Sequence, residues 1–157
     1  MALLTGDEII EIAMGLEERG ETFYTAAASK ATTAEIKELF EELAIQERYH
    51  RQAFQKMGRD LVRSTLTDEQ WDQFQAYAGV LLKQRVFEKP DSALGKAVEA
   101  QDEREALQAA IGFEDETLRF FRDLREVVRG SDQRAVDRII GEEEQHVRRL
   151  SGILAAL

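Results

Sequence analysis

The two histidines of this 157-residue chain each follow a glutamate by three positions. The first pair is Glu47 and His50, and the second is Glu143 and His146. Residues three apart lie on one face of an α-helix, so each pair can direct a carboxylate and an imidazole to a common point. Oxygen and nitrogen donors without sulfur suit iron or manganese, with zinc as an alternative, and they do not suit copper(I) or an iron–sulfur cluster.

Each Glu-x-x-His pair interrupts a run of apolar residues at helical spacing, and two further helical runs contain a single glutamate, Glu17 and Glu114. Four carboxylates directed into one core would repel one another and lose hydration. Two divalent cations would balance these four charges, so the pattern predicts two metal ions. The alternative is a metal-free interaction bundle whose histidines are ordinary core residues. The apolar residues of the four runs include Ala13, Phe40, Leu43, Phe54, Ala110, Val136, Ile139 and Leu150.

The chain also contains an internal repeat. Residues 13–24 align with residues 110–121 at an offset of 97, and this offset superimposes the two single glutamates. At an offset of 96, the Glu-x-x-His pair at 47–50 falls on the pair at 143–146. A repeat of this length is too long for a solenoid and indicates two copies of a helical hairpin related by a pseudo-twofold axis.

Helix-capping signals predict the first hairpin. A Thr-x-x-Glu motif at 5–8 opens a helix over about 7–29, and a second such motif at 32–35 opens a helix that ends near Gly58. The connection between the two helices is short, so they are expected to be antiparallel.

The second hairpin begins after a long connection. Its first helix follows Asp102 and extends to Val128, Gly130 stops that helix, and Ser131 caps the next one. The four long helices would each span roughly 33–40 Å at a rise of about 1.5 Å per residue. We therefore expect all 157 residues to form one all-α domain, a four-helix bundle with a long crossover.

The crossover at 59–101 is expected to contain two short helices, one capped by the Thr-x-x-Gln motif at 67–70 and one over about 92–100. Its aromatic residues would either cover the bundle or pack on a second subunit. These aromatic residues are Trp71, Phe74, Tyr77 and Phe87.

Residues next to the ligand candidates receive structural interpretations. Gly15 and Gly112 predict a close approach of neighbouring helices. Glu142 and Glu144 flank a ligand candidate but point off the apolar stripe, so we assign both to the solvated helix surface.

Composition narrows the classes of function. The chain has 21 Lys and Arg against 31 Asp and Glu, a net charge of −10, which argues against nucleic acid as a partner. The longest apolar run, 77–82, is too short to cross a bilayer, and the N-terminal residues lack a signal-peptide pattern, so we expect a cytoplasmic protein without a membrane partner. The absence of cysteine excludes disulfides, iron–sulfur clusters and thiol nucleophiles.

One glutamate from each of two helices and one Glu-x-x-His pair from each of two others is the ligand pattern of ferritin-like di-iron carboxylate bundles. The segments AIGFEDETLRFF at 110–121 and EEEQH at 142–146 resemble the rubrerythrin-like branch of that superfamily. The resemblance covers about 8–155 and implies a ferritin-like bundle of two pseudo-twofold hairpins.

Position by position, the resemblance implies a role for each ligand candidate. Glu17 and Glu114 would be terminal ligands on opposite irons, the glutamates of the two Glu-x-x-His pairs would bridge or share the metals, and each histidine would bind one iron. Tyr24 lies where such bundles often hold an aromatic residue near the metals, and core packing is its alternative role. Its repeat counterpart is Phe121.

The resemblance implies an oxidoreductase, peroxidase-like or oxidase-like, that acts on O₂ or peroxide. Rubrerythrins proper add a cysteine-ligated rubredoxin domain, which this chain lacks, so its electrons would come from a separate donor. They also offer an extra glutamate where this chain has Thr117, and the equivalent position on the first helix is Gly20. Related proteins are often dimers, so we expect a homodimer. Iron oxidation for storage or transfer in a larger assembly is an alternative function.

Overall fold

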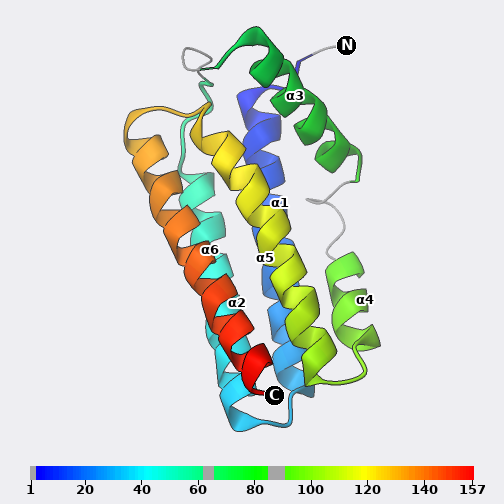
Figure 1. Cartoon of the computed structure of the whole chain (residues 1–157). Coiled ribbons are helices and arrows are strands. Elements are labelled where there is room, and N and C mark those ends of the chain that lie inside the picture. The colour runs from blue at the N-terminus through cyan, green and yellow to red at the C-terminus, as the bar shows by residue number, and fades with distance from the viewer. Residues whose placement is uncertain (1–2, 62–65, 85–90) are drawn as a thin grey trace.

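The computed structural model describes residues 3–61, 66–84 and 91–157, and within these ranges it contains six helices and no strand. The long helices lie side by side, and the shorter helices of the crossover lie outside them (Figure 1). The predicted all-α four-helix bundle with a helical crossover is confirmed. The long helices are α1 (Gly6–Lys30), α2 (Ala34–Gln55), α5 (Glu103–Arg125) and α6 (Gly130–Ala156), and the short ones are α3 (Asp68–Lys83) and α4 (Asp91–Glu99).

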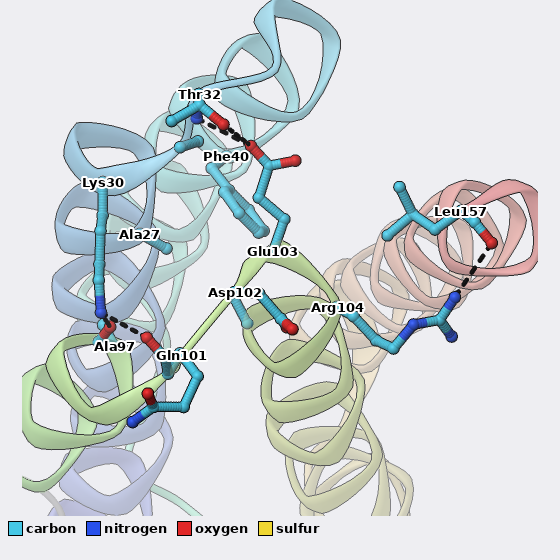
Figure 2. Close-up of a pocket in the computed structure, with 13 residues that line it drawn as sticks. Ala27, Lys30, Thr32, Phe40, Ala97, Gln101, Asp102, Glu103, Arg104 and Leu157 are labelled. Carbon is cyan, nitrogen blue, oxygen red and sulfur yellow. Dashed lines mark hydrogen bonds between the residues drawn. The ribbon is translucent and has the colours of Figure 1, made fainter.

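The start of α1 agrees with the sequence, and the start of α2 does not. The Thr5 hydroxyl accepts a hydrogen bond from the backbone N–H of Glu8, as predicted. The expected capping box at 32–35 is absent, because the carboxylate that satisfies this helix start comes from α5. Glu103 Oε1 accepts a hydrogen bond of 2.8 Å from the backbone N–H of Thr32 (Figure 2). The same oxygen accepts the backbone N–H of Thr33 at 2.7 Å.

The second hairpin differs from the prediction at its turn. The predicted cap Asp102 accepts the backbone N–H of Glu105 at 2.8 Å, but α5 ends at Arg125 rather than at Val128. Gly130 adopts a φ of +56°, which L-residues disfavour, and is itself the first residue of α6. The predicted Ser131 cap is wrong. The N-cap residue of α6 is Arg129, and its side chain makes no capping hydrogen bond.

The crossover covers the outside of the bundle along α1. The predicted capping box at 67–70 is present at the start of α3. Trp71 and Phe74 are buried in the core of this chain, whereas Phe87 lies outside the described residues. Lys30 at the end of α1, labelled beside Ala97 in Figure 2, donates hydrogen bonds to carbonyl groups of Ala97 and Val98 in α4 and of Ala100 just after it. These bonds attach the crossover to the bundle.

The apolar core is divided into two clusters. On α1, residues 9–16 belong to the first cluster and residues 23–28 to the second, and the other long helices are divided in the same way. The residues between the clusters are polar and buried, so the bundle contains a polar layer at mid-length. Among the described residues, no helix combines the length and apolar character needed to span a membrane.

Candidate metal centre

All six predicted ligands lie in this polar layer, and each is at most 3% exposed. They form two groups, and within each group one potential ligand atom per residue lies within 4.8 Å of the others. We call these groups position 1 and position 2. Position 1 consists of Glu17, Glu47, His50 and Glu143, and position 2 consists of Glu47, Glu114, Glu143 and His146. Each position therefore offers three carboxylates and one imidazole, and two carboxylates are common to both.

Both imidazoles direct Nδ1 towards the shared carboxylates. His50 Nδ1 lies 2.9 Å from Oε1 of Glu143, and His146 Nδ1 lies 2.7 Å from Oε2 of the same carboxylate. The two rings are nearly parallel, with centroids 5.8 Å apart. The pseudo-twofold relation seen in the sequence is thus reproduced in the arrangement of the side chains.

Unpaired oxygen atoms in the layer indicate that the residues fit a cation. Both carboxylate oxygens of Glu17 are buried and have no hydrogen-bond partner among the described residues. A buried polar atom without a partner costs about 1–3 kcal/mol, and more if it is charged. Divalent cations would satisfy these oxygens and would carry the positive charge that four ionised carboxylates need.

Three of the four glutamates have raised pKa values in the absence of metal. Burial, followed by repulsion from Glu143, raises the pKa of Glu47 and of Glu17 well above the usual value, and raises that of Glu114 to about 8. Glu143 is the exception, because hydrogen bonds from both imidazoles outweigh its burial and hold its pKa well below the usual range. Protons and metal ions would therefore compete for the same oxygen atoms.

The two imidazoles favour the charged form. Burial opposes their protonation, but hydrogen bonds to carboxylates outweigh it, with Glu143 as the main partner of His50 and Glu114 as that of His146. The pKa of His50 is raised to about 9 and that of His146 to about 12. Metal binding at Nδ1 requires that these protons leave.

Tyr24 packs in the core and also contacts one of the ligand candidates. Its ring packs on Phe23 and Phe40, and its hydroxyl donates a hydrogen bond of 2.5 Å to Oε1 of Glu114. The repeat counterpart Phe121 packs on Phe54 and has no hydroxyl to donate. This hydrogen bond to a carboxylate that belongs to position 2 alone has no equivalent at position 1.

A glycine allows one shared carboxylate to lie against α1, but it is not a glycine that the sequence indicated. A Cβ atom on Gly20 would lie 3.2 Å from both Cγ and Cδ of Glu47. The close approach expected at Gly112 is wrong, because a Cβ there would meet no atom within 4 Å.

Sequence reasoning missed two residues that contact the outer nitrogens of the imidazoles. Glu142 Oε2 lies 2.6 Å from His50 Nε2, and Gln46 Oε1 lies 2.5 Å from His146 Nε2. The side chain of Glu142 is 42% exposed, as expected for a solvated helix face, but the prediction did not include its contact with His50. The repeat contained the signal, since positions 46 and 142 are equivalent at the offset of 96 and each immediately precedes a shared glutamate.

An open cavity of about 560 Å³ lies elsewhere, at the end of the bundle where α1 and α4 meet the start of α5 (Figure 2). Lys30, Glu103 and Arg104 are among its lining residues, and it includes none of the six ligand candidates. The polar layer is thus distinct from this cavity.

The family model for rubrerythrin matches residues 8–154. The chain belongs to the rubrerythrin family. Rubrerythrin membership and the buried cluster of glutamates and histidines together indicate a metal site between the four long helices. Membership of the rubrerythrin family also confirms that the bundle is ferritin-like.

A solved structure supports this assignment of the rubrerythrin fold. A protein from Thermotoga maritima, described as a ferritin-like diiron-carboxylate protein, is 25% identical and superimposes with a TM-score of 0.67. The match covers 99% of this chain and 97% of that chain. No curated protein matches the sequence.

Proposed function

We propose that this rubrerythrin-family chain binds two iron ions and uses them to reduce O₂ or peroxide with electrons from a separate donor. The observation that carries the proposal is that Glu47 and Glu143 each belong to both positions. Two cations that share two carboxylates would be held close together, as a two-electron reaction requires.

The chain supplies the charge and the enclosure that such a centre needs. Four carboxylates would neutralise two divalent ions, and anionic oxygen donors favour the iron and manganese ions over softer metals. Apolar clusters on both sides of the polar layer exclude bulk water from it. Tyr24 holds the carboxylate of Glu114 in place through its hydroxyl proton. Bound iron would supply one electron per ion, which matches the two electrons that peroxide takes up on conversion to water.

The test is metal analysis of the protein after expression in iron-rich medium, followed by anaerobic addition of Fe(II) and exposure to O₂ or peroxide. We expect about two iron ions per chain and consumption of the oxidant in proportion to the iron present. A protein that takes up no Fe(II) would overturn the proposal. Glu47→Ala should abolish binding at both positions, whereas Glu144→Ala, on the exposed surface beside Arg122, should not change it.

The molecular mass in solution separates this function from iron storage. A homodimer, which we propose for this chain, cannot enclose a mineral core, whereas a storage protein needs a shell of many subunits. We therefore expect size-exclusion chromatography with light scattering to give the mass of two chains. A shell-sized assembly would favour storage.

A further inference from the structure

The two metal positions differ in the residues that contact the outer side of each imidazole. The Nε2 atom of His50 meets a carboxylate, that of Glu142, and the Nε2 atom of His146 meets a carboxamide, that of Gln46. These partners occupy equivalent places in the repeat, and each reaches across from the opposite hairpin. The same geometric contact therefore carries a negative charge at position 1 and no charge at position 2.

The neighbours of Gln46 determine which of its atoms faces the imidazole. Its amide nitrogen donates to Oε1 of Glu42 at 3.2 Å, so its oxygen is directed to His146. Glu42 in turn accepts a hydrogen bond of 2.8 Å from Arg149. This chain of contacts fixes the carboxamide as an acceptor for an Nε2–H group, the same role that the carboxylate has at position 1.

Glu142 is less constrained by its surroundings. Its other oxygen lies 4.0 Å from Arg138, which is itself exposed, and its side chain is 42% exposed. Arg138 corresponds to Glu42 at the repeat offset of 96, so the residue behind the acceptor also has opposite charge in the two hairpins. The charge of the carboxylate is thus only partly compensated, and it acts on the imidazole at a distance of 2.6 Å.

The carboxylates that belong to one position only, Glu17 and Glu114, also favour cation binding at position 1. Glu114 at position 2 accepts a hydrogen bond from Tyr24, which withdraws negative charge from one of its oxygens. Glu17 at position 1 accepts none, and its equivalent neighbour Phe121 has no donor. No hydroxyl donor therefore withdraws negative charge from the carboxylate of Glu17.

We propose that the metal positions are unequal and that position 1, with Glu17 and His50, binds the first divalent cation. The inference rests on the proposed two-metal centre and adds an order of loading to it. A carboxylate that accepts an imidazole N–H strengthens the other ring nitrogen as a ligand, and partners of this kind change metal affinity by about 10–100-fold. A carboxamide has a smaller effect, and the hydrogen bond from Tyr24 weakens the terminal ligand of position 2.

The two histidines of the chain make the order of loading directly observable. Metal-free protein labelled with ¹⁵N at histidine would be titrated with Zn²⁺ and followed by NMR, and each imidazole would be assigned by a His→Ala variant. We expect the His50 signals to change during the first equivalent and the His146 signals during the second. Competition with a chromophoric chelator would give two dissociation constants that differ by about 10-fold or more.

A variant that changes only charge tests whether the carboxylate of Glu142 causes the tighter binding at position 1. Glu142→Gln retains an oxygen acceptor for Nε2–H of His50 but removes the charge. We expect this variant to weaken the tighter dissociation constant by about 10-fold and to reduce or reverse the order in which the imidazoles respond. The Nε2 proton resonance of His50 should also move upfield, because a neutral acceptor makes a weaker hydrogen bond.

The reciprocal variant is Gln46→Glu, made together with Glu42→Gln to avoid repulsion between two carboxylates, with Glu42→Gln alone as its control. It should tighten the weaker dissociation constant, a gain that damage to the fold would not produce. Simultaneous changes at both imidazoles of the unmodified protein, or unchanged constants in Glu142→Gln, would overturn the unequal positions and leave the two-metal centre intact. A protein that binds no Zn²⁺ and no Fe(II) would overturn both proposals.

Discussion

Replacement of Glu17 by methionine is expected to change the stability of the protein in opposite directions with and without metal. Glu17 is fully buried on α1, and its oxygens have no hydrogen-bond partner among the described residues. Burial and the charge of Glu143 raise its pKa well above the usual value, and its nearest cationic contact, His50 Nδ1, lies 3.6 Å away, beyond hydrogen-bond distance. Methionine is of similar length, is apolar and adapts to irregular space.

The magnitude follows from the cost of the unpaired group. A buried polar group without a partner costs about 1–3 kcal/mol, so metal-free Glu17→Met should be more stable than the unmodified protein by that amount. For a chain of this length, 1 kcal/mol corresponds to about 2–4 °C, which gives an increase in Tm of about 2–12 °C. A metal at 100 times its dissociation constant adds about 2.7 kcal/mol, and the variant should lose most of this gain at position 1.

Thermal unfolding followed by circular dichroism, in the presence of a chelator and again with excess Zn²⁺, measures both effects. Glu11→Met makes the same substitution at an exposed position of the same helix. It should change neither the Tm of the metal-free protein nor the increase in Tm that Zn²⁺ causes. The reasoning would be refuted if metal-free Glu17→Met were less stable than the unmodified protein. It would be refuted equally if Zn²⁺ stabilised both proteins to the same extent.

Three further outcomes are expected. Gly20→Ala should weaken Zn²⁺ binding about 10-fold in a chelator competition, because its Cβ would lie 3.2 Å from the shared glutamate of α2, whereas Gly112→Ala should leave binding unchanged. Glu103→Ala should cost about 1 kcal/mol in urea unfolding at pH 7 through loss of the α2 cap. Hydrogen bonds from Thr33 lower the pKa of Glu103 to about 2, so this difference should be complete above pH 4.5 and should vanish as the pH falls through 2. The free energy of unfolding of the metal-free protein, measured with urea, should fall as the pH rises from 6 to 9. Folding raises the pKa of Glu114 to about 8 and that of His50 to about 9, so in this range the folded state holds protons that the unfolded state has already released. Equal stability at the two ends of this range would contradict the last expectation.

The six buried residues of the polar layer could be predicted from the sequence, because their spacing within each helix is local and the same pattern is repeated in the second hairpin. A Glu-x-x-His pair faces one direction on any α-helix, and its position within an apolar stripe predicts that this direction is inward. The repeat then relates Glu17 to Glu114 and one pair to the other without any knowledge of helix packing. The number of long helices and the position of the crossover follow from the same periodicity.

Other features depend on how the helices are placed against one another. The carboxylate that caps α2 is that of Glu103, about 70 residues away in the chain. The capping box predicted at 32–35 does not form, because a carboxylate that the fold brings near can replace the local glutamate. Gly20 matters because Glu47 of the neighbouring helix lies against it, and no property of its own helix indicates this.

The sequence by itself determined the class of the fold, the six residues of the polar layer and their division between two hairpins, because spacing along a helix fixes which side chains share a face. Only the tertiary structure decided which side chain contacts the Nε2 atom of each imidazole. Glu142 meets His50 and Gln46 meets His146 across helices that are more than 90 residues apart in the chain. Such contacts depend on the rotation and separation of α2 and α6, which are set by the packing of the whole core.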